Sequence, residues 1–350
     1  MIQFPIIKDL DDYVKDILNN ISFTKNLEFD GFIDISAEEL NKMLTYKYSN
    51  FPLFERIKEM SEKIAYNNYA GNTKYARSIE KILKENLNIK LDLKAIFNNF
   101  FISKYSKYKD KIDGNYLYYE DACIFLYLKS LLVGFNTNHV IKQVVIDEAQ
   151  DYSLIQYIIL KKIFKRASFT ILGDTNQTIN PYYHYNSLDE ISKIIESKYL
   201  KLTKTYRSSP EIIEYANKIL NLNHVVAVRN SKVIPVIEKN SSNVLDLIDD
   251  IKSNIDKFKR IAIITKNDLD TNYIYNNLKD KFNISNMLNV ITNPNLVVIP
   301  AYLAKGLEFD MVIVYTTFEN KFLKRDKYLY YVAVTRCQHK LIIYNNSYNF

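Results

Sequence analysis

Apolar residues recur along the chain at two different spacings, which predict where helices and strands lie. In the first third, Ile57, Met60 and Ile64 follow the period of a helix, and a second pattern of this kind begins at Ile79. Residues 1–115 are therefore expected to be mainly helical.

Two short apolar runs in the middle of the chain predict neighbouring strands. Residues 143–147 and 168–172 carry β-branched residues, and residues 154–164 between them favour a helix. A strand, a helix and a strand at this spacing predict a parallel βαβ unit, whose strands we expect to be buried. Another apolar helix is expected over 117–132, ended by Gly134.

The same alternation of apolar strands and amphipathic helices returns after residue 200 and predicts a second α/β lobe. The expected fold class is therefore α/β with parallel sheets, preceded by the helical region. The elements expected in the second lobe are helices at 211–220 and 269–279 and strands at 260–265, 311–315 and 340–344.

Length, charge and cysteine content narrow the class of protein. A chain of 350 residues with 47% apolar residues suits two folded domains, and its net charge of +7 favours a nucleic-acid partner only weakly, because the lysines are spread out. Cys123 and Cys337 are too few for a disulfide framework. With no secretory leader and no apolar run of membrane-spanning length, we expect a cytoplasmic protein without a membrane partner.

Two adjacent carboxylates, Asp147 and Glu148, end the first predicted strand. Ligands of α/β proteins bind at the carboxyl ends of parallel strands. There Asp147 would hold Mg²⁺ through its water shell and Glu148 would polarise an attacking water, as in a nucleotide triphosphatase. A solvated acidic turn is the structural alternative, and two acids alone do not decide between them.

A second polar group, Gly173, Asp174 and Gln177, follows the neighbouring predicted strand. Glycine permits a tight exit from the sheet, and Gln177 is placed to contact a γ-phosphate. An ordinary Gly-Asp turn is the alternative.

Two arginines are further candidates for phosphate contacts. Tyr206 and Arg207 offer a ring for stacking a base beside a guanidinium for a phosphate, although Ser208 or Ser209 before Pro210 also predicts a helix N-cap. Arg336 ends an apolar segment and could stabilise transferred-phosphate charge from another lobe; a solvated surface charge is the alternative.

The phosphate-cradling sequence G-x-x-x-x-G-K-[ST] is absent from these 350 residues, because none of the six glycines is followed by lysine. Positioning and electrostatics supply most of the catalysis of phosphoryl transfer, so we do not expect this chain to hydrolyse ATP alone.

In chain order, five segments resemble motifs of the UvrD/Rep-like superfamily 1 helicases. Within them, phrases such as DEAQDYS look most like HelD, the helicase-like factor that binds bacterial RNA polymerase. The five segments are VVIDEAQD at 144–151, GDTNQ at 173–177, TYRSS at 205–209, AKGLEFD at 304–310 and YVAVTR at 331–336.

The resemblance implies two RecA-like lobes with ATP and Mg²⁺ between them and single-stranded nucleic acid across their top. On this basis, residues 1–115 are a helical insertion or remnant of the first lobe. Residues 116–200 are a partial first lobe with the Walker B motif and motif III, and residues 201–350 are the second lobe with motifs IV, V and VI.

The resemblance also implies a role for each matching residue. Asp147 and Glu148 would serve magnesium and water activation, Gln177 would sense the γ-phosphate, and Arg207 and Arg336 would be arginine fingers. The remaining implied roles are adenine stacking for Tyr206, a ribose contact for Glu308 and a close backbone approach at Gly306.

Three departures from the family pattern leave three hypotheses open. Walker A and the adenine-reading glutamine motif are missing, residues 210–303 leave no room for the family's large insertion, and a tyrosine-rich segment at 180–185 replaces the tail of motif III. In the first hypothesis, the chain is the carboxyl-terminal part of a UvrD/HelD-like ATP-dependent DNA helicase or translocase acting on single-stranded or duplex DNA. Alternatively, it is a non-catalytic module that binds RNA polymerase or nucleic acid, or a subunit completed in trans by a P-loop chain.

Overall fold

A computed structural model describes residues 3–105, 117–180, 184–230, 236–288 and 295–345. The chain divides into two compact units, each made of three segments that alternate along the sequence. The boundary expected at residue 115 lies outside the described residues. Unit one comprises Met1–Ile146, Tyr152–Ile171 and Ile191–Ser197; unit two comprises Asp147–Asp151, Leu172–Glu190 and Lys198–Phe350.

Unit one is mainly helical, as the apolar spacing predicts. Its one hairpin reverses at Asp30 and Gly31, both with a positive φ, which suits a tight β-turn. The elements are α1 (Gln3–Asn20), β1 (Leu27–Phe29), β2 (Ile33–Ile35), α2 (Ala37–Lys42), the π-helix η1 (Met43–Lys47), α3 (Leu53–Asn68), α4 (Ala76–Glu85), α5 (Leu93–Lys104), α6 (Tyr119–Leu132), α7 (Leu154–Ile163) and most of α8 (Asp189–Ile195).

A single hydrophobic core runs through these helices, from α1 to α7. Phe97 and Phe100 of α5 are almost fully buried in it. Two tyrosines fasten α1 to its neighbours, because Tyr105 donates to Asp9 Oδ2 at 2.5 Å and Tyr127 donates to Asp11 Oδ1 at 2.9 Å. Burial sets the fold of this unit, and partly buried tyrosine–aspartate hydrogen bonds fix the position of its first helix.

The predicted βαβ unit is present as β3 (Gln143–Ile146), α7 and β4 (Ser168–Ile171), with the two strands parallel. Ser153 and Gln156 form a capping box at the start of α7. The expectation that these strands are buried is wrong, since Val145 is 64% exposed. The physical reason is that the described residues leave one face of this two-stranded sheet uncovered, so that Gln143, Val145, Ser168 and Thr170 on that face are all exposed.

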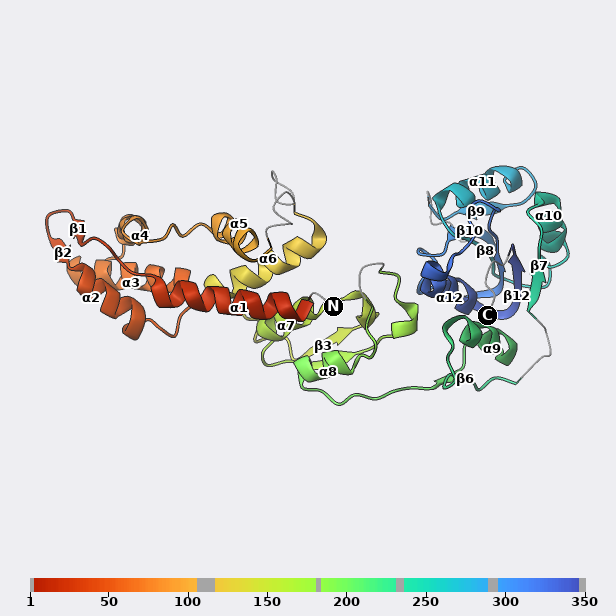
Figure 1. Ribbon diagram of the computed structural model, residues 1–350, viewed down its shortest axis with the longest axis horizontal. Helices are drawn as coiled ribbons and strands as arrows, with labels where there is room; N and C mark the ends of the chain where they lie inside the picture. The colour runs from red at the N-terminus through yellow and green to blue at the C-terminus, as the bar shows by residue number, and fades with distance from the viewer. Residues whose placement is uncertain (1–2, 106–116, 181–183, 231–235, 289–294, 346–350) are drawn as a thin grey trace. The chain divides into compact units, whose positions relative to one another are not determined.

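Unit two is built on a six-stranded parallel sheet in the order β7-β12-β11-β8-β10-β9, which confirms the expected α/β class (Figure 1). The strands predicted at 260–265, 311–315 and 340–344 are present, and the sheet has three more that the sequence analysis did not predict. Its strands are β7 (Ile237–Lys239), β8 (Ile261–Thr265), β9 (Ile284–Asn286), β10 (Leu296–Pro300), β11 (Phe309–Val314) and β12 (Cys337–Tyr344).

Helices cover both faces of this sheet, so its central strands are continuous apolar runs. Alternate residues of β8 face opposite sides: Ala262 and Ile264 pack with α9 (Pro210–Leu220) and α12 (Lys327–Thr335). Ile261 and Ile263 pack instead with α10 (Val244–Lys252) and α11 (Asp268–Leu278). The shorter pieces are η3 (Ala149–Asp151), η4 (Thr175–Gln177), β5 (Lys204–Thr205), β6 (Val226–Ala227) and η5 (Lys324–Asp326).

Within the described ranges, no helix has both the length and the apolar character needed to cross a membrane.

Candidate functional site

Arg336 is the most deeply buried charged side chain of the candidate site. It is the C-cap residue of α12, directly before β12, and it is only 1% exposed. Its guanidinium donates to the carbonyl oxygens of Val332 at 3.1 Å and Leu307 at 3.4 Å, and to Gln177 Oε1 at 2.6 Å. A further bond reaches Thr335 Oγ1 at 3.3 Å. All of these partners are neutral oxygens.

A buried guanidinium with neutral partners is electrostatically costly. Burial lowers the pKa of Arg336 to about 10, and the positive charge of Arg207 adds to this effect. The negative charges of Glu148, Glu308 and Asp174 act in the opposite direction and raise the pKa of Arg336, but by less. The site therefore holds a cation that its own partners do not neutralise directly, as is expected where an anion binds.

Gln177 faces Arg336 because a short helical turn fixes it. Asp174 is the N-cap of η4 and accepts from the backbone N–H of Asn176. Its other carboxylate oxygen accepts from Gln177 Nε2 at 2.7 Å, which turns Gln177 Oε1 toward Arg336. The structure thus brings together two residues 159 positions apart that were predicted to share a γ-phosphate.

The Asp147–Glu148 turn is held by hydrogen bonds within unit two. Glu148 has φ of 52°, an unusual left-handed conformation for this residue, and its N–H donates to Asp147 Oδ1. Gln150 Nε2 donates to Glu148 Oε2 at 2.5 Å, and Gln150 Oε1 accepts from the N–H of Asp174 at 2.9 Å. Gln150 therefore links the two acidic turns that follow β3 and β4.

Lys305 is a member of this site that the sequence analysis missed. Its ammonium lies 2.6 Å from Asp151 Oδ2 and 3.2 Å from Glu148 Oε2, and its side chain is only 9% exposed. The sequence could have indicated Lys305 through its position in the AKGLEFD segment. It lies two residues before Leu307, whose carbonyl oxygen accepts a hydrogen bond from Arg336.

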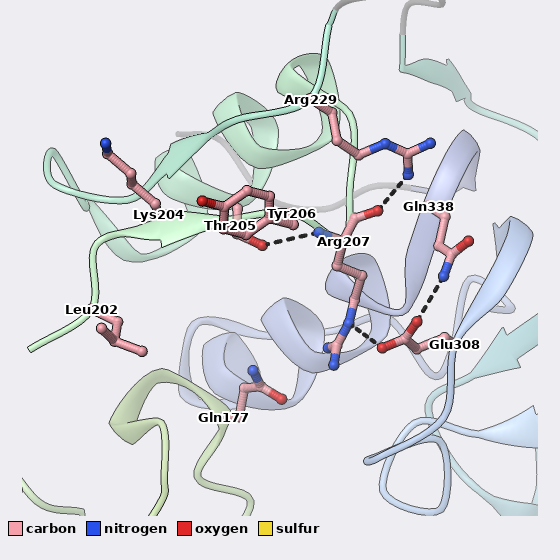
Figure 2. A pocket seen from close by; sticks show the side chains of 9 residues that line it. All are labelled: Gln177, Leu202, Lys204, Thr205, Tyr206, Arg207, Arg229, Glu308 and Gln338. Carbon is pink, nitrogen blue, oxygen red and sulfur yellow. Dashed lines mark hydrogen bonds and ion pairs between the residues drawn. The ribbon is translucent and has the colours of Figure 1, made fainter.

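Beside this network, unit two has a cavity of about 700 Å³, shown in Figure 2. Arg207 Nε pairs with Glu308 Oε1 at 2.6 Å, and Glu308 Oε2 accepts from Gln338 Nε2 at 2.7 Å. Tyr206 is 71% exposed, so its ring is open to a ligand. The lining residues are Gln177, Leu202, Lys204, Thr205, Tyr206, Arg207, Arg229, Glu308 and Gln338.

Arg229 is a second residue that the sequence analysis missed. Its guanidinium donates to the carbonyl oxygen of Arg207 at 2.6 Å (Figure 2). It also contacts His339 Nδ1 at 3.2 Å. It thereby ties the Tyr206–Arg207 segment to β12. Nothing in the local sequence around Arg229 marks it, because its partners come from two distant segments.

The serines after Arg207 also fasten this segment to β12. Ser209 is the N-cap residue of α9, as predicted for one of the two serines, but its side chain makes no capping hydrogen bond. Ser208 Oγ donates to the carbonyl oxygen of Cys337 at 2.5 Å, and the Ser209 N–H donates to that of Gln338.

Two glycines are needed here for different reasons. Gly306 has φ of 79°, and an added Cβ would meet open space, so it serves the turn rather than a close contact in this structure. At Gly173, an added Cβ would lie 2.8 Å from the Cβ of Ala149 and 2.7 Å from Gln150 Oε1. Gly173 therefore permits close packing of the two acidic turns.

Four of the eight predicted site residues line the cavity, namely Gln177, Tyr206, Arg207 and Glu308. Arg336 does not line the cavity, but it donates a hydrogen bond to Gln177, which does. In the tyrosine-rich segment, Tyr182 and Tyr183 lie outside the described residues and Tyr185 is 4% exposed, so Tyr185 packs in the protein rather than facing a base.

The residues present fit a magnesium ion that is held mainly by its water shell and a phosphate. Among the residues that the structure describes, no three His, Cys, Asp or Glu side chains converge as a metal site. The carboxylate of Asp147 is exposed beside the turn that holds Glu148. A single carboxylate suits Mg²⁺, which commonly keeps several waters and binds substrate phosphates.

The fold and site define an α/β protein with parallel sheets, whose second unit gathers carboxylates, glutamines and three arginines. The chain belongs to the UvrD/REP helicase family of superfamily 1. The family model of the UvrD/REP helicase N-terminal domain matches residues 7–189, more than half of the chain. That of the UvrD-like helicase C-terminal domain matches residues 285–348. The finer resemblance to HelD stays a prediction.

Among curated relatives, the chain is 28% identical over 198 residues to RecBCD enzyme subunit RecB of Buchnera aphidicola, covering 51% of this chain and 15% of that protein. It is 35% identical over 85 residues to ATP-dependent DNA helicase srs2 of Schizosaccharomyces pombe, covering 23% and 10%. The chain thus spans only a small part of the length of these relatives.

One similar solved structure is the C-terminal domain of a possible DNA helicase from Lactobacillus plantarum. It is 26% identical, with a TM-score of 0.34, over 41% of this chain and 88% of that one. Another is the helicase of PRRSV, 15% identical with a TM-score of 0.35, over 58% of this chain and 35% of that one.

Proposed function

We propose that this chain carries the nucleotide-contacting residues of the carboxyl-terminal part of a UvrD-like ATP-dependent DNA helicase or translocase. It binds Mg²⁺ and ATP in unit two but does not hydrolyse ATP alone. The observation that carries the proposal is Arg336, which is 1% exposed and, among the residues that the structure describes, has only neutral hydrogen-bond partners. A phosphate beside Gln177 would supply the missing negative charge.

The neighbouring residues fit the remaining parts of a nucleotide. Tyr206 and Leu202 line the cavity and are mostly exposed, so they offer an apolar surface to a base. Glu308 can accept from ribose hydroxyls, and its ion pair with Arg207 holds that guanidinium in the cavity. When bound beside Asp147, magnesium would neutralise phosphate charge.

Hydrolysis would depend on Glu148 and on groups that this sequence lacks. The carboxylate of Glu148 accepts a hydrogen bond from Gln150 Nε2, which orients it as a water-polarising group requires. The backbone cradle of a P-loop is absent from these 350 residues. Helicases of this family use ATP and Mg²⁺; for this chain, binding without turnover is the proposal.

Thermal unfolding with and without Mg²⁺ and AMPPNP, a non-hydrolysable ATP analogue, tests the proposal. Ligand at about 100 times its dissociation constant adds about 2.7 kcal/mol to the unit that binds it, roughly 5 to 10 degrees for a unit of this size. Adenosine is the control for binding through the base alone. An unchanged melting temperature at saturating AMPPNP would refute the proposal and favour the non-catalytic binding module, to be tested with RNA polymerase.

A second candidate function, completion in trans by a P-loop chain, is favoured by the exposed sheet of unit one. The β3–β4 sheet has two strands, and the side chain of Val145 within it is 64% exposed. Unpaired strand edges accept added strands, and an exposed apolar side chain favours a covering partner.

Co-expression with the product of a neighbouring reading frame that encodes G-x-x-x-x-G-K-[ST] tests this completion. We expect the two chains to purify together and Val145→Lys to weaken the complex. Val140→Lys is the matched control, since Val140 is 86% exposed but precedes the strand. Equal effects of the two variants would contradict docking on β3.

We also infer that the partner nucleic acid is single-stranded or duplex DNA and that the protein acts in the cytoplasm. The family membership and the net charge of +7 support the DNA partner. Fluorescence anisotropy with a labelled oligonucleotide at two salt concentrations measures this binding. Affinity that does not fall with salt would argue against phosphate contacts.

A further inference from the structure

Lys305 places a positive charge beside the residue proposed to activate water. Its ammonium contacts Glu148 Oε2 at 3.2 Å and Asp151 Oδ2 at 2.6 Å, and its side chain is 9% exposed. It lies in the loop between β10 and β11, immediately before Gly306, whose positive φ turns the chain there. A lysine buried to this degree is retained only with charged partners.

Lys305 and Arg336 are the two ends of one continuous chain of polar contacts. Each neighbouring pair along it lies within 3.2 Å. Two cations, 31 positions apart in the sequence, therefore flank one row of acidic and amide side chains. The order of the chain is Lys305, Glu148, Gln150, Asp174, Gln177 and Arg336.

The geometry puts the ammonium within reach of a terminal phosphate. A general base lies about 3 Å from the water that it activates, and that water lies about 3 Å from the phosphorus that it attacks. Lys305 is 3.2 Å from Glu148, so its flexible four-carbon stem needs only a small movement to reach a phosphate oxygen.

We propose that Lys305 is a triphosphate-binding cation of this chain. When the β- and γ-phosphates enter, its ammonium exchanges its contacts with Asp151 and Glu148 for phosphate oxygens. It thereby supplies, from the loop after β10, positive charge of the kind that a P-loop lysine supplies. The inference rests on the proposed nucleotide site and extends it to a residue with no role assigned so far.

A purely structural role for Lys305 predicts a different result from mutation. If its ion pairs only fasten the acidic turn to the β10–β11 loop, removing either partner should weaken the site in the same way. If Lys305 binds phosphate, Asp151→Asn frees the ammonium and removes a negative charge, so affinity is kept or rises. Lys305→Met removes the cation, so affinity falls.

Isothermal titration of the full chain with Mg²⁺ and AMPPNP, with tripolyphosphate and with adenosine separates these cases. We expect Lys305→Met to weaken AMPPNP and tripolyphosphate binding by about 10- to 100-fold, with adenosine binding unchanged. Asp151→Asn should bind at least as tightly as the wild type, and Lys305→Arg should keep most of the affinity. Should Lys305→Met fail to fold, the double variant with Asp151→Asn, which removes both charges, provides the same comparison.

Two outcomes would overturn the inference, and they are distinct from failure of the proposed function. Lys305→Met with wild-type affinity for both phosphate ligands is one, and equal losses in Lys305→Met and Asp151→Asn are the other. If Arg336→Met weakens AMPPNP binding while Lys305→Met does not, the nucleotide site stands and only Lys305 is misassigned. If the wild type binds neither ligand, both proposals fall.

Discussion

Replacing Arg336 by methionine separates two reasons why a protein keeps a buried arginine. A structural arginine holds segments together, and its loss lowers stability. A ligand-binding arginine costs free energy until its ligand arrives. Methionine fills a similar volume without the charge, so this substitution tests the cost of the charge rather than that of a cavity.

The structure gives the magnitude of each contribution. Burial lowers the pKa of Arg336 from 12.5 to about 10, which corresponds to roughly 3 kcal/mol of destabilisation by the charged form at neutral pH. This cost is present below pH 10 and fades as the pH rises through 10 to 12.5. Against it stand the bonds to Val332, Leu307 and Gln177, each worth about 1 kcal/mol net. The two contributions nearly cancel.

We therefore expect Arg336→Met to change the free energy of unfolding of the nucleotide-free chain by no more than about 1 kcal/mol. Affinity for Mg²⁺ and AMPPNP should fall about 100-fold, because a charge-assisted phosphate contact is lost. Urea titration followed by circular dichroism measures the first quantity, and isothermal titration measures the second. A loss of stability above about 3 kcal/mol with unchanged affinity would show that Arg336 is structural.

Three further predictions concern other parts of the molecule. Glu148→Gln should leave AMPPNP binding intact and abolish phosphate release by a complex reconstituted with a P-loop chain; unchanged turnover would remove Glu148 from its role. Gly173→Ala should cost about 1 to 3 kcal/mol in urea titrations, because its Cβ would lie 2.8 Å from that of Ala149, whereas Leu172→Ala at a 52% exposed neighbour is the mild control. Burial and the hydrogen bond to Asp9 raise the pKa of Tyr105 to about 12, so unit one should be fully stabilised below pH 10 and lose stability as the pH rises from 10 to 12. Tyr105→Phe should flatten that loss in urea titrations, and an unchanged pH profile would contradict the assignment.

Much of the fold could be predicted from local patterns. Strand β8 and the carboxyl-terminal halves of β11 and β12 are apolar runs that are buried on both faces, so their composition alone marks them. In contrast, β9 has only three residues, and β7 is an edge strand in which Ile237 pairs with β12. Short strands carry too few residues for a pattern, and their place depends on neighbours far along the chain.

The site could be predicted where a motif carries it and not where tertiary contacts create it. Gln177 contacts Arg336, and both residues lie in segments that the sequence analysis had identified as motifs from their order and residue types. Lys305 and Arg229 belong to the site only through tertiary contacts. Lys305 contacts Asp151, 154 positions away, and Arg229 contacts Arg207, 22 positions away. The exposure of Val145 was missed because an apolar run indicates burial only where other elements cover both faces of the sheet.

The alternation of the two units along the chain decides which fragments of this protein are informative. A fragment that begins at residue 198 would contain the whole six-stranded sheet and the three arginines of the site, Arg207, Arg229 and Arg336. It would lack Glu148, Asp151 and Gln177, which belong to the same compact unit but come from earlier in the chain. In such a fragment Lys305 would have lost both of its carboxylate partners, and Arg336 would have lost Gln177 while keeping the carbonyl oxygens of Val332 and Leu307. Its binding properties would then describe a released lysine and an arginine with an open donor, and not the site of the intact chain.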